Sequence, residues 1–274
     1  MSKKLVVFIS GSSGSGKNTV INKLIDNNSS YGYIKSYTTR KMREKDKEGE
    51  YYNFISKKEF ETKIKEGELL EFDLYSNNYY GISKDTISNT LVEKDVVFKD
   101  ITLAGVKNSK ERINDTKIVS VFFSVEKKEL VERLTKCDKE HLKERMKFFV
   151  KEQKRRFDAD YVIKNTELNE TASTIKTLID FEQNNKNFLP TKSCQEVLDK
   201  KVNKYANKLN KGKTVKPIYI TIKGGKIYIV DGVHRYLASL KCGKHLCKVV
   251  LDDEVTLPQD LNVKEWNKLV KMYK

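Results

Sequence analysis

Apolar residues gather in short blocks that alternate with longer amphipathic segments. Leu5–Ser10 is an almost unbroken apolar run before a glycine-rich loop, and residues 18–26 after that loop have apolar positions at helical spacing. Further apolar blocks at Asp95–Ile101, Lys117–Val125 and Ala159–Asn165 predict strands. Strands that alternate with helices indicate an α/β domain whose parallel sheet is covered on both faces.

Charged segments with helical periodicity separate these blocks. The predicted helices are Lys127–Lys136, Lys139–Arg156 and Asn169–Phe181. The polar stretch that follows, residues 182–193, contains Pro190 and has no periodic pattern. We therefore predict one domain over residues 1–184 and a second over residues 185–274.

The second domain is predicted to be a smaller α+β unit built around a hairpin. Ile218, Ile220 and Ile222 alternate with other residues, Gly224-Gly225 supplies a two-residue turn, and apolar alternation resumes on the return. The other predicted elements are helices over Gln195–Leu209, 233–242 and Val263–Tyr273 and a strand over 247–251. Gly243 is placed to end the middle helix, because glycine tolerates the left-handed conformation found there.

The formal net charge of +16 is unevenly distributed. Residues 191–274 carry 18 lysines and arginines against 8 acidic residues, a balance of +10. Such a surface attracts phosphates, nucleotides or nucleic acid, although a general preference for lysine explains the same excess. The chain has no apolar run long enough to span a membrane and no signal peptide, so we expect a cytoplasmic protein without a membrane partner.

The glycine-rich loop "GSSGSGK" fits the phosphate-binding pattern G-x-x-x-x-G-K. Its backbone N–H groups turn toward phosphate oxygens, the helix that follows adds its dipole, and Lys17 reaches the β and γ phosphates. The candidate ATP-binding residues are Gly11, Ser13, Gly14, Gly16, Lys17, Asn18 and Thr19. The pattern calls for Ser or Thr after the lysine as a Mg²⁺ ligand, so either Asn18 or Thr19 is the candidate here.

The segments "SYTTRKMREKDKEGEYYNFISKKEFE", "GELLEF" and "NNYYGISKD" follow the loop in order. With them, residues 1–183 resemble guanylate kinase. The resemblance implies a P-loop nucleoside monophosphate kinase fold with a lid and a base-binding insert. It also implies an activity, in which the γ-phosphoryl group of ATP passes to GMP or dGMP with Mg²⁺ as cofactor.

Carried over by position, the resemblance assigns roles on the acceptor side. Two forked guanidinium groups and three hydroxyl groups suit the acceptor's phosphate; they belong to Ser36, Arg40, Arg43, Tyr52 and Tyr80. Glu71 would accept hydrogen bonds from the guanine edge. Asp100, at the end of a predicted strand, would lie near the reacting phosphates.

On the ATP side, Arg133 and Arg145 flank "LTKCDKEHLKE", which resembles a lid that closes over the transferred phosphoryl group. Asn165 would lie beside the adenine. Catalysis would consist of positioning and charge neutralisation by Lys17, Arg40 and the two lid arginines. The alternative for Arg133 and Arg145 is that they are ordinary cations on a helix surface.

Three positions depart from the guanylate kinase pattern. Ile82 stands where a hydroxyl usually contacts the base, Thr102 stands where a second aspartate is usual, and Lys136 or Cys137 stands where a lid arginine is expected. Replacing polar groups of a substrate pocket changes which substrates it accepts. The acceptor is therefore GMP, dGMP, or a different or modified nucleotide.

A second candidate phosphate loop is Asp231-Gly232-Val233-His234-Arg235, at the start of a predicted helix. With it, residues 188–252 resemble the fold shared by the ParB N-terminal domain, sulfiredoxin and the free serine kinases. The resemblance implies that Gly232, His234 and Arg235 bind nucleotide phosphates. Asp231 is either a general base toward a hydroxyl substrate or a turn residue, and Val233 replaces the reactive cysteine of sulfiredoxin.

Three functions remain open from the sequence. The first is a nucleotide kinase with an appended domain that binds a second nucleotide or phosphoester. The second is a bifunctional enzyme whose C-terminal domain phosphorylates a small hydroxyl compound. The third is a nucleic-acid-directed nucleotide kinase or sensor, in which the basic second domain binds the nucleic acid.

Overall fold

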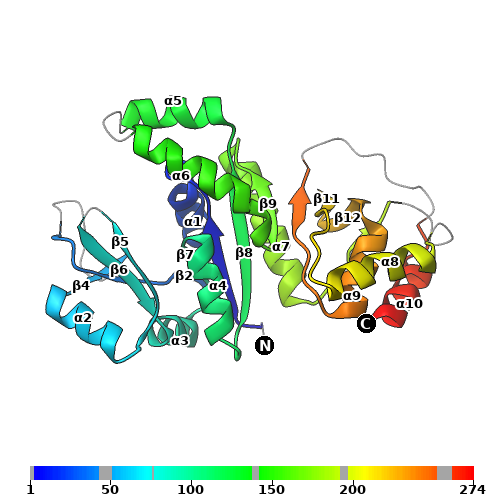
Figure 1. Cartoon of the computed structure of the whole chain (residues 1–274), viewed down its shortest axis with the longest axis horizontal. Helices are drawn as coiled ribbons and strands as arrows, with labels where there is room; N and C mark the ends of the chain where they lie inside the picture. The colour runs from blue at the N-terminus through cyan, green and yellow to red at the C-terminus, as the bar shows by residue number, and fades with distance from the viewer. Residues whose placement is uncertain (1–2, 43–50, 76, 138–141, 192–196, 252–260) are drawn as a thin grey trace. The chain divides into compact units, whose positions relative to one another are not determined.

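The computed structural model describes residues 3–42, 51–75, 77–137, 142–191, 197–251 and 261–274 of the 274-residue chain (Figure 1). Two compact units are present, Met1–Val121 and Phe122–Lys274, and the division falls within strand β8 (Lys117–Ser124). The predicted domain boundary near residue 184 is a different division of the chain and stays a prediction.

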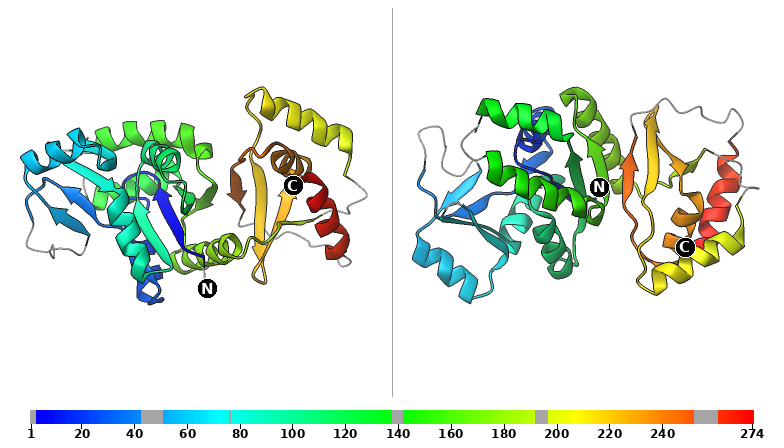
Figure 2. Two further views of the ribbon diagram at one scale, coloured as in Figure 1. Left: turned by 90° about the horizontal axis from the view of Figure 1, so that it is seen from below. Right: turned by 45° about the horizontal axis from the view of Figure 1, so that its top comes forward.

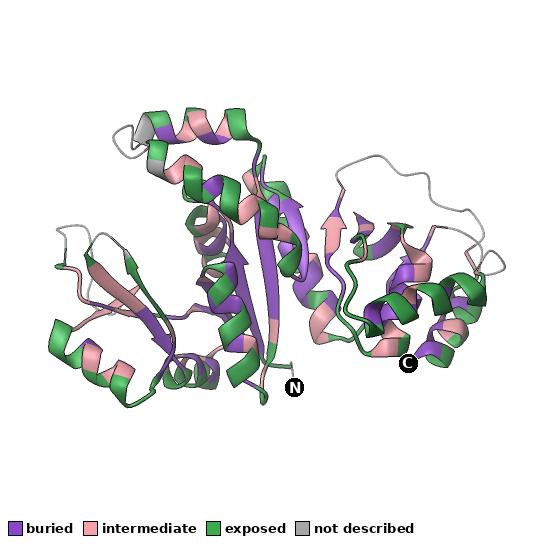
Figure 3. Cartoon of the chain, viewed as in Figure 1, coloured by how far each residue is buried: buried purple, intermediate pink, exposed green. Residues whose placement is uncertain are grey.

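Parallel strands form the centre of the first unit, in the order β1–β7–β2. β1 (Leu5–Ser10) pairs with one side of β7 (Val96–Asp100), and β2 (Tyr31–Tyr33) pairs with the other side. Every residue of β1 is buried (Figure 3). A strand covered on both faces has no polar alternation, which is why a continuous apolar run predicted it.

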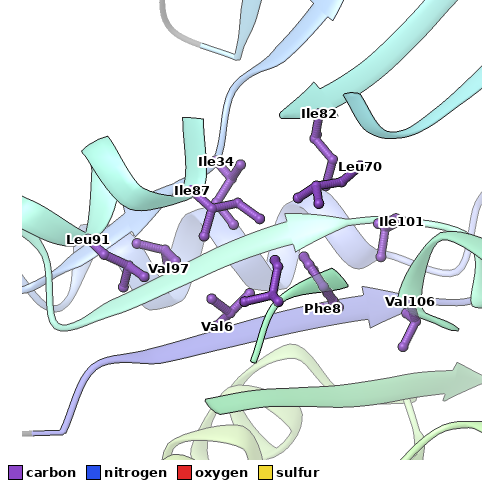
Figure 4. Close-up of a cluster of buried hydrophobic side chains, with 11 residues drawn as sticks. Val6, Phe8, Ile34, Leu70, Ile82, Ile87, Leu91, Val97, Ile101 and Val106 are labelled. Carbon is purple, nitrogen blue, oxygen red and sulfur yellow. The ribbon is translucent and has the colours of Figure 1, made fainter. Parts of the chain in front are cut away.

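Helices α1 (Lys17–Asp26), α3 (Lys84–Glu93) and α4 (Leu103–Arg112) belong to the same unit. A buried apolar cluster joins α3, α4, the parallel strands and a second sheet (Figure 4). Its members are Val6, Phe8, Ile34, Leu70, Ile82, Ile87, Leu91, Val97, Ile101, Val106 and Ile113. The second sheet is therefore anchored to the parallel strands by shared core contacts.

The second sheet has four strands in the order β4–β3–β6–β5. β3 and β4 are parallel, whereas β6 is antiparallel to both β3 and β5. The bounds are β3 (Ser36–Thr38), β4 (Tyr52–Phe54), β5 (Leu69–Tyr75) and β6 (Asn78–Ser83). Helix α2 (Lys57–Lys65) lies beside this sheet (Figure 1), begins with a Ser56–Glu59 capping box and buries Phe60.

The second unit begins with the end of β8 and two helices, α5 (Lys127–Cys137) and α6 (Leu142–Arg155). Leu130 and Leu134 of α5 pack with Phe149 of α6 in a small apolar cluster. A 3₁₀ turn (Arg156–Asp158), strand β9 (Tyr161–Lys164) and helix α7 (Leu168–Gln183) follow.

Strands of the second unit continue beyond β9 in the order β9–β13–β11–β12–β10. β13 (Lys248–Val250) pairs in parallel with β9, with Lys248 opposite Tyr161 and Val249 opposite Val162. The remaining strands are β10 (Leu189–Pro190), β11 (Ile218–Lys223) and β12 (Lys226–Asp231). β11 and β12 form the predicted hairpin, and both turn glycines, Gly224 and Gly225, have positive φ.

Three helices group beside this hairpin: α8 (Asp199–Asn210), α9 (Val233–Cys242) and α10 (Val263–Tyr273) (Figure 2). Trp266 of α10 is fully buried, stacks on Tyr236 of α9 and donates its indole N–H to the carbonyl oxygen of Phe188 at 2.6 Å. Gly243 ends α9 in the left-handed conformation, as predicted.

Most predicted elements are confirmed, with shifts of a few residues at their ends. One start is wrong: the helix predicted from Gln195 begins at Asp199, because Leu198 is extended and donates its backbone N–H to His234. Residues 192–196 and 138–141 lie outside the described part of the chain. None of the described helices combines the length and apolar character needed to cross a bilayer.

Candidate active site

The glycine-rich loop connects β1 to α1 in the first unit. Gly11, Gly14 and Gly16 have φ values of 139°, 81° and 86°, which side-chain-bearing residues rarely adopt. The loop closes on itself through the N–H of Ser15, which donates to the carbonyl oxygen of Ser12 at 3.0 Å. Gly16 caps α1 without a side-chain hydrogen bond, and the N-terminus of a helix favours an anion through its dipole.

Lys17 begins α1 and folds back over the loop. Its Nζ donates to the carbonyl oxygens of Gly11 at 2.7 Å and Ser12 at 3.0 Å. Asn18 and Thr19 follow on the same turn, and both are exposed. Within the described residues their side-chain oxygens make no hydrogen bond, and hard oxygen donors of this kind suit Mg²⁺.

Strand pairing in the second sheet brings together the hydroxyl residues predicted for the acceptor's phosphate. Ser36 of β3 is opposite Tyr52 of β4, and Thr38 of β3 is opposite Tyr80 of β6. The rings of Tyr52 and Tyr80 meet edge to face with centroids 6.0 Å apart. Three residues that are 16 to 44 positions apart in sequence thus share one surface.

Arg40 projects over this surface. Its guanidinium carbon lies 5.2 Å from the ring centroid of Tyr52 and 5.4 Å from that of Phe54, a cation–π arrangement. One Nη donates to the carbonyl oxygen of Lys41 at 2.9 Å. Arg43, the second predicted arginine, lies outside the described residues.

Glu71 of β5 is the predicted base-reading residue, and its carboxylate lies against Gly105 of α4. Burial raises the pKa of Glu71 to about 7, although the charge of Lys99 opposes the shift. Ile82 is opposite Glu71 in the sheet but is only 1 % exposed and belongs to the apolar core. The Thr102 hydroxyl accepts the N–H of Gly105 at 3.1 Å and so caps α4.

Asp100 lies at the end of β7 with two neighbours that the sequence reasoning missed. Tyr33 donates its hydroxyl hydrogen to Oδ1 of Asp100, and the buried ammonium of Lys99 lies 3.3 Å from the same oxygen. Burial would raise the pKa of Asp100, but Lys99, Tyr33 and Lys17 together lower it to about 2. The sequence feature that could have revealed Lys99 is a lysine inside an apolar strand, "VVFKD".

The predicted lid and adenine-side residues lie in the second unit. Arg133 of α5 pairs with Glu129 one turn earlier and donates to the carbonyl oxygen of Asn165 at 3.2 Å. Asn165 is buried, and its N–H donates to the carbonyl oxygen of Ser124 at 3.2 Å. Arg145 lies half-buried on α6. Arg133 and Asn165 therefore meet, and their roles toward a nucleotide stay predictions.

The second candidate loop begins α9. Gly232 has φ 106° and caps the helix without a side-chain hydrogen bond. Arg235 is buried, donates to Oδ2 of Asp231 at 2.8 Å, and has an Nε that finds no hydrogen-bond acceptor among the described residues. His234 accepts the N–H of Leu198 through Nε2 at 3.1 Å, which commits that nitrogen to the protein. Asp231 is 66 % exposed at its side chain.

Comparison with known proteins gives one consistent result for the kinase-like part. The guanylate kinase family model matches residues 2–182. Guanylate kinase of Campylobacter jejuni is 36 % identical over 179 residues, 64 % of this chain and 87 % of that protein. Guanylate kinase of Mycoplasmoides gallisepticum is 37 % identical over 180 residues, 64 % of this chain and 91 % of its own length.

The fold agrees with that match. The crystal structure of guanylate kinase from Anaplasma phagocytophilum superposes with a TM-score of 0.53 at 26 % identity, covering 67 % of this chain and 88 % of that one. A glycine-rich loop before α1, hydroxyl residues on paired strands of the second sheet and a carboxylate packed against α4 accompany the match. The chain belongs to the guanylate kinase family of nucleoside monophosphate kinases.

Proposed function

We propose that this protein transfers the γ-phosphoryl group of ATP to GMP, dGMP or a related or modified nucleoside monophosphate. The observation that carries the proposal is the acceptor surface, on which Arg40, Tyr52, Tyr80 and Ser36 converge within the second sheet. A forked cation stacked on a tyrosine beside further hydroxyl groups matches the geometry and charge of a phosphomonoester.

Catalysis in this proposal rests on positioning and charge. An oxygen of the acceptor phosphate forms a bond to the γ phosphorus while the bond to the β–γ bridging oxygen breaks, and the electron pair leaves with ADP. The loop N–H groups and Lys17 hold the donor phosphates, while Arg40 holds the acceptor. Arg133 and Arg145 neutralise the charge of the transferred group. Mg²⁺, held at Asn18 or Thr19, would screen the charge of the donor phosphates.

Base selectivity rests on fewer polar groups than in the family pattern. Glu71 retains the carboxylate that would accept adjacent N–H donors of guanine. Ile82 is committed to the core and Thr102 to capping α4, so neither supplies the contact expected there. A pocket with fewer such contacts discriminates less sharply between purine bases, which is why a modified purine nucleotide belongs among the acceptors to test.

A phosphoryl-acceptor panel tests the proposal. The full chain is incubated with ATP, Mg²⁺ and one of GMP, dGMP, IMP, AMP, CMP or dTMP, and ADP formation is followed. We expect turnover with GMP or dGMP, a loss of at least ~100-fold in Lys17→Ala, and near-normal rates in Lys23→Ala, a lysine on the same helix. Absence of turnover with every nucleoside monophosphate would contradict the proposal.

A second phosphate site at the start of α9 is the function that the C-terminal part supports best. The observation that favours it is Arg235, buried beside an uncapped helix N-terminus with its Nε lacking an acceptor among the described residues. A phosphate oxygen would supply that acceptor and receive the N–H groups of the first turn. This agrees with the resemblance of residues 188–252 to the ParB, sulfiredoxin and free serine kinase fold. It leaves open whether a small hydroxyl compound is phosphorylated there.

Binding stoichiometry tests the second site. Calorimetry with ADP should give two sites in the full chain and one in Arg235→Gln, whereas Lys241→Gln, on the far end of α9, should retain two. If one site is seen in the unaltered chain and it is lost in Lys17→Ala, the C-terminal site does not exist. Turnover of free serine or a similar alcohol that vanishes in Asp231→Asn would identify the bifunctional alternative.

A further inference from the structure

Tyr33, Lys99 and Asp100 form a polar cluster on two neighbouring parallel strands, β2 and β7. The ammonium of Lys99 donates to the Tyr33 hydroxyl oxygen at 2.8 Å and lies 3.3 Å from Oδ1 of Asp100. Tyr33 in turn donates to that same Oδ1. Strand pairing explains the meeting, because Tyr33 is opposite Phe98, next to Lys99 on β7.

The burial of Lys99 sets this cluster apart from surface ion pairs. Its side chain is 6 % exposed, whereas Asp100 remains 30 % exposed. A buried ammonium is costly unless it is paired and hydrogen-bonded. Lys99 also lies over the ring of Tyr33 at 4.5 Å and of Tyr52, an acceptor-surface residue, at 6.0 Å. The buried cation therefore lies at the border of the acceptor surface.

The direction of the hydrogen bonds is fixed by the chemistry of the three groups. Lys99 carries only donors, so it donates to both oxygens. Burial raises the pKa of Tyr33 well above its usual value of 10, and the charge of Asp100 raises it further, so the phenol keeps its proton. Its single hydrogen is then directed to Asp100. Oδ1 thus receives two donors, while Oδ2 accepts no hydrogen bond within the described part of the chain.

We infer that Tyr33 and Lys99 are positioning residues for Asp100: they clamp Oδ1 so that a charged Oδ2 faces hydrogen-bond donors of the bound nucleotides or their water. The inference rests on the proposed phosphotransfer. The cluster adjoins the donor site as well, because Lys17 is close enough to stabilise the charge of Asp100. A carboxylate with one oxygen clamped keeps one orientation, which positioning catalysis requires.

The pH dependence of kcat at saturating ATP and acceptor tests the inference. Charged and titratable groups that face Asp100 are Lys99 on its own strand, Tyr33 on β2, Lys17 on α1 and Glu71 on β5. In Lys99→Met, burial is no longer opposed by the neighbouring ammonium and Asp100 takes up a proton in the accessible range. We expect the ratio of kcat at pH 8 to kcat at pH 6 to rise at least tenfold over the unaltered protein.

Two further variants separate positioning from mere stability. Tyr33→Phe should lower kcat about threefold to tenfold, because one of two donors to Oδ1 is lost. Lys4→Met, which removes the exposed Lys4–Asp95 pair (3.2 Å) before the first residues of β1 and β7, should leave the pH ratio unchanged. Thermal unfolding of each variant confirms that it is folded at the assay temperature.

A double variant gives the decisive outcome. If Lys99 acts through Asp100, Lys99→Met combined with Asp100→Asn should be no slower than Asp100→Asn alone. The inference would be overturned if the kcat losses of the two single variants multiplied in the double variant. An unchanged pH ratio in folded Lys99→Met would also overturn it. These outcomes differ from failure of the proposed function itself, in which the unaltered protein phosphorylates no acceptor.

Discussion

Glu71 and Gly105 are in direct contact across the boundary between β5 and α4. A β-carbon built on Gly105 would lie 1.6 Å from Oε2 and 2.3 Å from Cδ of Glu71. Gly105 lies within a helix and its backbone there suits any residue, so the glycine is required by the neighbouring carboxylate and not by its own conformation. The space at residue 105 therefore sets the position of the Glu71 carboxylate.

Gly105→Ala should displace Glu71 and weaken acceptor binding. We expect the KM for GMP to rise about 10- to 100-fold, with a smaller change in kcat, because the methyl group occupies the place of the carboxylate. Initial-rate kinetics at saturating ATP measure the split. Asn108→Ala, on the exposed side of the same helix, is the matched control and should leave KM unchanged.

Acceptor affinity should depend on pH through Glu71. Because burial raises the pKa of Glu71 to about 7, the ionised fraction increases about tenfold between pH 6 and pH 8. A carboxylate that accepts two N–H donors must be ionised, so the KM for GMP should fall over this interval by about the same factor. Glu71→Gln should give a higher KM that no longer changes with pH. A flat profile in the unaltered protein would count against the assigned role.

The same shift has a consequence for the stability of the unliganded protein. The pKa of Glu71 is higher in the folded chain than its ordinary value of 4.5. Its stabilising contribution is therefore complete below pH 4.5 and is lost as pH rises through about 7. Relative to Glu71→Gln, the unaltered protein should lose up to ~3 kcal/mol of unfolding free energy between pH 4.5 and pH 8. Urea denaturation of both proteins at the two pH values measures the difference.

Arg40→Lys should weaken the acceptor site although the charge is kept. Lysine lacks both the planar group that stacks on Tyr52 and Phe54 and the fork that binds two phosphate oxygens. The KM for GMP should rise about 10- to 100-fold. Arg155→Lys, at an exposed pair with Asp158, is the control with the same chemical change, and equal effects of the two substitutions would contradict the prediction.

Ile82→Ser restores the residue type usual in the family, but it should damage the fold instead of improving base recognition. Ile82 is 1 % exposed within the apolar cluster that includes Ile34 and Leu70 (Figure 4). We expect a loss of about 2–4 kcal/mol in the free energy of unfolding, against about 1 kcal/mol for Ile82→Val. If the Ile82→Ser protein is as stable as the parent and binds GMP more tightly, the side chain at this position reaches the pocket.

The parallel strands and the hairpin could be predicted from sequence because each has a strong local pattern. β1 is continuously apolar, and Gly224-Gly225 marks the turn between β11 and β12. The four-stranded second sheet was absent from the predicted elements. β3 and β4 have three residues each, too few for periodicity to register, and β3 also pairs with β6, more than 40 residues away.

The site residues also fall into two groups, those that a sequence motif reveals and those that only the tertiary fold reveals. The glycine-rich loop and Arg40 lie in recognisable motifs, so the sequence alone names them as candidates. Tyr33, Lys99 and Gly105 carry no motif, and their importance arises from neighbours that only the tertiary fold brings to them. Motif position alone puts Ile82 beside the base, whereas β6 becomes buried over its last three residues and Ile82 packs in the apolar cluster that also contains residues of α3.

The pairing of β13 with β9 means that the C-terminal segment covers an edge of β9. Without it, Tyr161 and Val162 would present unpaired peptide groups along an apolar strand, the kind of open edge through which proteins aggregate. A chain truncated after residue 184 would lose β13 and so expose this edge of β9. A natural chain without β13 would need another way to protect the edge of β9 from aggregation, such as charged residues or a β-bulge.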